Sequence, residues 1–95
     1  MKVLIVDDEK LARLNIVNQL DSSFTIIESP SYEDALRKLE NQSFDICYID
    51  LKLDDSKELL GLKLIPLSIT RGFYTVVMTS IDDELVAEMA YDLGC

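Results

Sequence analysis

The sequence predicts an α/β fold with a parallel sheet, because two kinds of pattern alternate regularly along the chain. Short apolar runs of strand length alternate with stretches in which apolar residues recur at helical spacing. Strands that are separated by helices pair in parallel and are joined by right-handed crossovers. A third observation concerns function: acidic residues close two of the apolar runs, so they are expected at the ends of buried strands.

The apolar runs and the helical patterns place each element. Residues 3–6 are apolar throughout, as in a strand that is buried on both faces. The other predicted strands cover residues 24–28, 44–49 and 74–78. Helices are predicted over residues 9–20, 31–39, 58–69 and 80–93.

Local signals mark several helix ends. The first helix is predicted from the helical spacing of Leu11, Leu14, Val17 and Leu20. Asp8 can cap this helix, and Ser31 with Asp34 approximates a capping box for the second. Pro66 is expected to kink or shorten the third helix because it lacks an amide hydrogen.

Length and composition limit the class of protein. The chain has 95 residues and an apolar content of 48%, which fits one domain with a modest core. No apolar run approaches the roughly 18 residues of a membrane span, and the short run near the N-terminus does not suit an export signal. Cys47 and Cys95 form no disulfide or metal-binding pattern, so a cytoplasmic, reduced protein is expected, with Cys47 as a small buried hydrophobe.

Charge excludes other classes. The net charge is −9 and neither half of the chain has a basic cluster, so this segment is not expected to contact nucleic acid directly. The sequence has no histidine, which excludes histidine-based nucleophilic or general-base catalysis.

Three carboxylates form the candidate site. Asp7 and Asp8 close the run 3–6, and Asp50 closes the run 46–49. If the two strands are parallel neighbours, these side chains meet at one edge of the sheet. Carboxylates that close repel one another and would take up a proton unless a cation intervened, and Mg²⁺ prefers such oxygen ligands. The alternative for the pair Asp7 and Asp8 is a simple helix cap.

Three segments of the chain resemble the receiver domain of two-component response regulators. The order of these segments, their spacing and their placement on strands all agree with that family, from Lys2 onward. The segments are Lys2-Val3-Leu4-Ile5-Val6-Asp7-Asp8-Glu9, Tyr48-Ile49-Asp50-Leu51 and Val76-Val77-Met78-Thr79-Ser80. The resemblance implies a doubly wound, flavodoxin-like parallel sheet with strand order 2-1-3-4, in which ligands bind beyond the carboxyl ends of the strands.

The resemblance also implies a function and the roles of individual residues. Asp50 would accept a phosphoryl group from the phosphohistidine of a histidine kinase or phosphotransfer protein. Asp8, Asp50 and the backbone carbonyl of Lys52 would ligate Mg²⁺, and Asp7 would act through a bound water. Thr79 matches the switch hydroxyl of the family. The chain would then be a signal relay, not an enzyme, and it would control an output domain or effector that is not in this chain.

The chain departs from the family pattern after Asp50 and at its end. The positions that usually hold proline and glycine carry Asp54 and Glu58, so this loop is expected to be longer. Residues 1–95 stop before the family's fifth strand, its lysine and its last helix, and we expect a C-terminally truncated receiver domain. Without that lysine, Lys52 is a candidate modulator of the lifetime of the phosphoryl group. The alternative, which the sequence supports equally, is that the Lys52 side chain points into solvent.

Truncation predicts exposed apolar surface. Strand 74–78 would form a sheet edge with unpaired backbone groups, and parts of 3–6 and 76–78 would face water. Association through this edge, as a homo-oligomer, is therefore expected.

Two function classes stay open at the sequence level. A phosphoacceptor receiver is favoured by the three acids with Thr79, whereas a degenerate, unphosphorylated interaction module is favoured by the early stop. A metal-dependent phosphatase of another α/β family is disfavoured because Asp50-Leu51-Lys52 lacks a second acid. Nucleotide binding is disfavoured because no glycine-rich loop follows the first strand.

Overall fold

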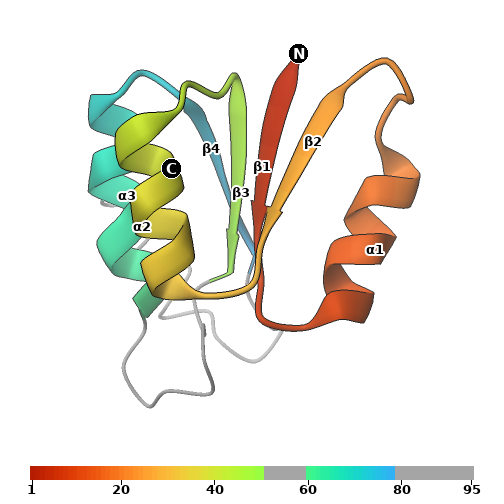
Figure 1. Ribbon diagram of the computed structural model, residues 1–95, viewed down its shortest axis with the longest axis horizontal. Helices are drawn as coiled ribbons and strands as arrows, with labels where there is room; N and C mark the ends of the chain where they lie inside the picture. The colour runs from red at the N-terminus through yellow and green to blue at the C-terminus, as the bar shows by residue number, and fades with distance from the viewer. Residues whose placement is uncertain (51–59, 79–95) are drawn as a thin grey trace.

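The computed structural model describes residues 1–50 and 60–78, and within these ranges the chain forms strands and helices in strict alternation (Figure 1). In chain order they are β1 (Lys2–Val6), α1 (Lys10–Gln19), β2 (Thr25–Ser29), α2 (Tyr32–Asn41), β3 (Ile46–Asp50), α3 (Leu60–Thr70) and β4 (Tyr74–Met78). The helix predicted over 80–93, like Thr79 and Lys52, lies outside the described residues. None of the helices in these two ranges is long and apolar enough to cross a membrane.

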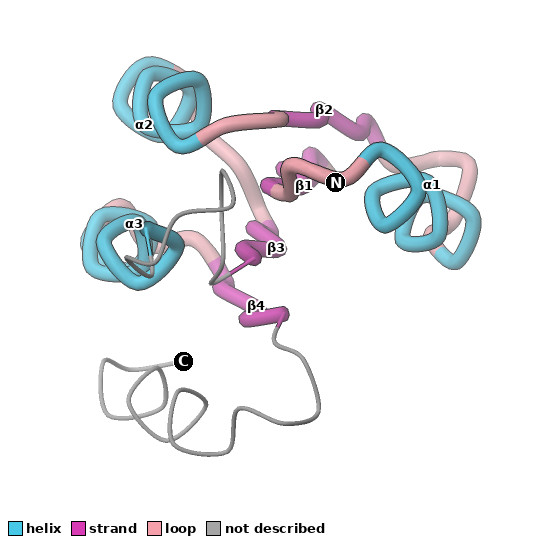
Figure 2. Tube along the Cα trace, turned by 90° about the horizontal axis from the view of Figure 1, so that it is seen from below, coloured by secondary structure: helices cyan, strands magenta, loops and turns pink. Residues whose placement is uncertain are grey.

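The strands form one parallel sheet in the order β2-β1-β3-β4, which confirms the predicted topology. Figure 2 shows α1 on one face of the sheet and α2 with α3 on the other, so the sheet is doubly wound. In the ladder, Val6 lies opposite Ser29 of β2 and Ile49 of β3. The carboxyl ends of β2, β1 and β3 therefore finish at the same edge of the sheet.

The apolar run of β1 forms the centre of the sheet. Val3, Leu4, Ile5 and Val6 are completely buried, which confirms that this strand is covered on both faces. Since both faces of this strand are shielded from solvent, the prediction that part of the run 3–6 faces water is wrong. In the described sheet β4 is the edge strand, and its residues Val76 to Met78 are half-buried.

The main core lies between the sheet and the pair α2 and α3. Leu4 and Val6 pack there with Cys47 and Ile49 of β3, and residues of the two helices pack against them. The helix residues of this cluster are Ala35, Leu39, Leu64 and Ile65. Phe44 and Phe73 complete it with an edge-to-face contact, their ring centroids 5.8 Å apart.

Cys47 behaves as the sequence predicted. It is a buried free thiol in this core, and burial raises its pKa to about 11. A thiol with such a pKa stays protonated at neutral pH and is chemically inert.

Helix α1 differs from its predicted form in two respects. Leu11 and Leu14, which suggested the helix, are 74% and 47% exposed, and no residue of α1 is fully buried. The helix begins after Glu9, and Asp8 does not cap it. Instead, the Glu9 amide donates a hydrogen bond of 2.9 Å to Oδ1 of Asp7, because the Asp8 carboxylate lies in the acidic cluster described below.

The other helix signals are partly confirmed. Ser31 caps α2 by accepting a hydrogen bond of 3.2 Å from the Asp34 amide. Pro66 does not shorten α3, which continues through it to Thr70. After α3 the chain turns into β4 at Gly72, whose φ of 81° is a conformation that suits glycine.

The two leucines Leu39 and Leu11 test this distribution of burial. Leu39→Ala should lower the free energy of unfolding by about 2–4 kcal/mol, because the completely buried side chain leaves a cavity between α2 and the sheet. Leu11→Ala removes the same atoms from an exposed site and should change it by less than about 0.5 kcal/mol. Urea unfolding followed by circular dichroism measures both. Equal losses in the two variants would contradict the burial seen for α1.

Candidate metal centre

Three carboxylates meet at the carboxyl edge of the sheet, as the sequence predicted. Asp7 and Asp8 follow β1, and Asp50 is the last residue of β3. Since β1 and β3 are parallel and paired up to Val6 and Ile49, their ends lie side by side. One carboxylate oxygen from each of the three aspartates lies within 4.8 Å of the other two.

Asp7 is held at three points, two on its backbone and one on its side chain. Its amide donates a hydrogen bond of 3.1 Å to the carbonyl of Ser29. Its carbonyl accepts a hydrogen bond of 2.7 Å from Nη1 of Arg13, and its carboxylate accepts from the Glu9 amide. Asp7 is only 6% exposed, whereas Asp8 and Asp50 are half-buried. The deepest acid of the cluster is thus fixed through its amide, its carbonyl and its carboxylate.

Burial and repulsion act together on Asp7. Burial raises the pKa of the Asp7 carboxyl above its ordinary value, and the negative charge of Asp8 adds to this rise. The hydrogen bond from the Glu9 amide opposes the rise without cancelling it. In the absence of a cation, the folded cluster therefore holds a proton more readily than an isolated aspartate does.

The donor set fits a hard divalent cation. Three carboxylates offer charged oxygen ligands, which Mg²⁺ and Ca²⁺ prefer. A cation would offset the repulsion from Asp8, which adds to the rise that burial causes in the pKa of Asp7. Asp7, Asp8 and Asp50 could therefore hold Mg²⁺. The further residues predicted for the site, Lys52 and Thr79, lie outside the described ranges.

Arg13 was missed by the sequence reasoning. It reaches the site from α1, six residues after Asp7. A weak signal was present: Lys10 and Arg13 put positive charge near the start of α1, where the helix dipole favours acidic residues, and the first turn has none. Cations in such a place indicate that a nearby negative group attracts them.

Comparisons with known proteins agree with this geometry. Residues 3–95 match the family model of the response regulator receiver domain. The chain belongs to this family, and it is a receiver domain of two-component signalling.

Two curated relatives show the extent of the sequence similarity. The chain is 38% identical over 58 residues to the sensory transduction protein LytR of Staphylococcus haemolyticus, which covers 58% of this chain and 23% of LytR. It is 33% identical over 100 residues to protein-glutamate methylesterase/protein-glutamine glutaminase 2 of Caulobacter vibrioides, which covers 99% of this chain and 28% of that protein. The chain thus spans about a quarter of the length of the curated relatives it matches.

Solved structures share the fold. A response regulator receiver protein from Pseudoalteromonas atlantica has a TM-score of 0.81 at 28% identity, over 100% of this chain and 80% of that one. A response regulator from Burkholderia pseudomallei, solved with a phosphorylated aspartic acid, a calcium ion and citrate, has a TM-score of 0.81 at 22% identity, over 99% of this chain and 55% of that one.

Removing one charge tests the repulsion within the cluster. Without divalent cations, Asp8→Asn should raise the free energy of unfolding by about 1 kcal/mol, because a like charge leaves the neighbourhood of Asp7 and Asp50. The same variant should lose most of the stabilisation that Mg²⁺ gives the wild type. Urea unfolding with chelator and with Mg²⁺, at constant ionic strength, measures both effects.

Glu40→Gln is the matched control, because it removes an equal charge from an exposed position in the last turn of α2. Its unfolding free energy should change by less than about 0.5 kcal/mol. If Asp8→Asn destabilises the cation-free protein, the three carboxylates do not repel one another as described.

Proposed function

We propose that this receiver domain accepts a phosphoryl group on Asp50 from the phosphohistidine of a histidine kinase or phosphotransfer protein. The supporting observation is the convergence of Asp7, Asp8 and Asp50 at the joined ends of β1 and β3. In a member of the receiver family, such a cluster suits an acceptor carboxylate beside a bound Mg²⁺.

The environments of Asp7 and Asp50 favour Asp50 over Asp7 as the acceptor. Asp7 is nearly buried and its carboxylate accepts a hydrogen bond from the Glu9 amide, so a phosphoryl donor on another protein would reach it poorly. Asp50 is half-buried and belongs to β3, where its backbone lies opposite Met78 of β4. A nucleophile on a rigid strand end is both accessible and preorganised.

Transfer requires an in-line displacement at phosphorus. A carboxylate oxygen of Asp50 forms the new bond to phosphorus while the bond from phosphorus to the histidine nitrogen breaks, and that electron pair returns to the imidazole. Mg²⁺, when bound, would supply positive charge beside the oxygens of the transferring phosphoryl group. Asp8 and Asp50 would hold the ion, with the Lys52 carbonyl, and Asp7 would act through a water.

The consequence of phosphorylation is proposed from the family and the relatives. The Thr79 hydroxyl would respond to the phosphoryl group, and the side chain of Lys52 would modulate its lifetime. The relatives are named a sensory transduction protein and a methylesterase, so we propose that this chain controls an output domain or effector in the cytoplasm and is not itself the enzyme. Association through the β4 edge stays a prediction.

Phosphorylation by a small donor tests the acceptor. Wild-type protein incubated with acetyl phosphate and Mg²⁺ should gain the mass of one phosphoryl group, measured on the intact protein. Asp50→Asn should abolish this gain because the nucleophilic oxygen is replaced by an amide. Asp45→Asn is the matched control: Asp45 precedes the opposite end of β3, where its carboxylate accepts the Lys2 amide, and its variant should still be phosphorylated.

Two results would contradict the proposal. A phosphoryl group that persists in Asp50→Asn would place the acceptor elsewhere. No gain in the wild type with either acetyl phosphate or a histidine kinase would instead support an unphosphorylated interaction module.

A further inference from the structure

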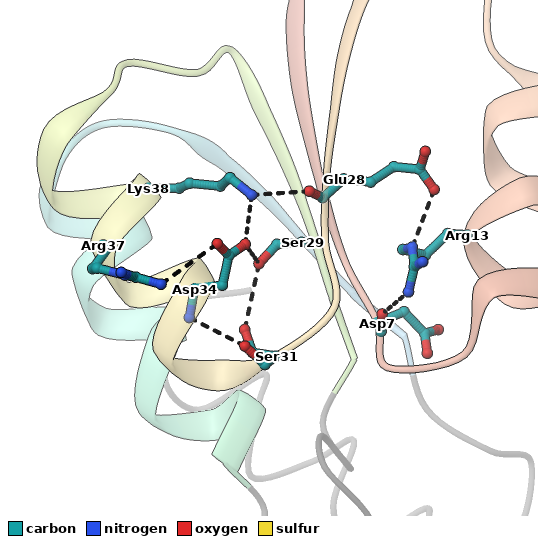
Figure 3. A network of polar contacts seen from close by, with 8 residues as sticks. All are labelled: Asp7, Arg13, Glu28, Ser29, Ser31, Asp34, Arg37 and Lys38. Carbon is teal, nitrogen blue, oxygen red and sulfur yellow. Dashed lines mark hydrogen bonds and ion pairs between the residues drawn. The ribbon is translucent and has the colours of Figure 1, made fainter.

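Arg13 connects the acidic cluster to the neighbouring strand. Its guanidinium Nη1 donates a hydrogen bond of 2.7 Å to the carbonyl of Asp7, and its Nε lies 3.1 Å from a carboxylate oxygen of Glu28 on β2. The Arg13 side chain is only 13% exposed. Figure 3 shows the guanidinium between these two partners. A nearly buried cation in contact with the backbone of the candidate site calls for an explanation beyond helix packing.

The contact with Asp7 constrains the next residue. The Asp7 carbonyl belongs to the planar peptide unit that joins Asp7 to Asp8, so its direction also fixes where the α-carbon of Asp8 lies. The other peptide unit of Asp7 is fixed by its amide, which donates to Ser29. The carboxylate of Asp8 therefore starts from a backbone that β2 and α1 hold together.

Glu28 is itself held from the opposite side of the sheet. Lys38 of α2 donates a hydrogen bond of 3.1 Å to the Glu28 carbonyl and also contacts the Asp34 carboxylate (Figure 3). Asp34 accepts a hydrogen bond of 2.6 Å from the hydroxyl of Ser29, which is completely buried. These contacts fix the end of β2, and with it the carboxylate that orients Arg13.

We propose that Arg13 is a positioning residue for the divalent-cation site, and that Glu28 orients its guanidinium and offsets its charge. This inference rests on the proposed cation site. Arg13 does not ligate the ion. It holds the Asp7–Asp8 peptide so that the Asp8 carboxylate lies close enough to those of Asp7 and Asp50 to ligate the same ion.

Charge and position make opposite predictions for the removal of Arg13. By charge alone, loss of a nearby positive group strengthens the binding of a cation. By position, loss of the hydrogen bond frees the Asp7–Asp8 peptide and weakens binding, because supporting contacts tune the affinity of metal ligands. The double variant Arg13→Ala with Glu28→Gln removes one charge of each sign, so it isolates the positional effect.

Calorimetric titration of the full chain with Mg²⁺ tests the inference. The double variant should bind Mg²⁺ roughly tenfold more weakly than the wild type. Glu28→Gln keeps the Arg13 bond to Asp7 and should lose less affinity than the double variant. Arg13→Lys keeps one donor and should recover part of the affinity, since a single ammonium cannot hold both partners as the guanidinium does.

Arg37→Ala is the charge control. Arg37 lies on α2, its side chain is 75% exposed, and its guanidinium lies 3.9 Å from the Asp34 carboxylate. It should bind Mg²⁺ at least as tightly as the wild type. Circular dichroism at the titration temperature shows which variants are folded. If the double variant is unfolded, the Mg²⁺ affinities of Arg13→Lys and Glu28→Gln are compared instead.

The two possible failures are distinguishable. A wild type that binds no Mg²⁺ overturns the proposed cation site. A wild type that binds Mg²⁺, together with a folded double variant of equal or higher affinity, overturns the role of Arg13 alone. An equal loss in Arg37→Ala would also overturn it, because the effect would then come from distant charge.

Discussion

The gathering of three like charges at one edge of the sheet is the constraint on which the rest of the structure depends. Asp7, Asp8 and Asp50 would separate if their backbones were free, because each stands within a few ångströms of the others. They cannot separate because β1 and β3 are paired residue by residue up to Val6 and Ile49. The strand pairing and the apolar core that packs on these strands thus fix the distance between the charges, and the fold preorganises the site for a cation.

The backbone around the acids is held in the same way. Strand β2 supplies the carbonyl of Ser29 and α1 supplies the guanidinium of Arg13, so both peptide units of Asp7 are fixed by different elements. Lys38 and Asp34 secure the end of β2 from the other face. A ligand set held this firmly costs stability when it is empty, and it gains affinity because little ordering is left to occur on binding.

Short-range patterns in the sequence predicted the strands and placed the acids at strand ends, whereas the strand order that brings the acids together was implied by the resemblance to the receiver family. The run of β4 was predicted with its observed bounds, and β1 and β3 with errors of one or two residues. The exposure of Leu11 and Leu14 on α1 was not predicted, since the helical spacing of apolar residues does not show which side of a helix packs on the sheet. Asp8 was considered both as a helix cap and as a member of the acidic cluster, and the structure shows the second. The contact of Arg13 with Glu28 is a tertiary feature that no local pattern indicated. The roles of Thr79 and Lys52 depend on motif resemblance alone.

The relaxation of backbone amide resonances by substoichiometric Mn²⁺, which replaces Mg²⁺ at oxygen sites and broadens nearby signals, tests most directly whether the three aspartates form a cation site. If the three aspartates bind the cation, the amides of Asp8, Glu9 and Asp50 should broaden first, while those in the second half of α2, such as Leu39 and Glu40, keep their intensity. Broadening that is uniform over the acidic surface, or strongest away from the ends of β1 and β3, would contradict a cation site at the three aspartates.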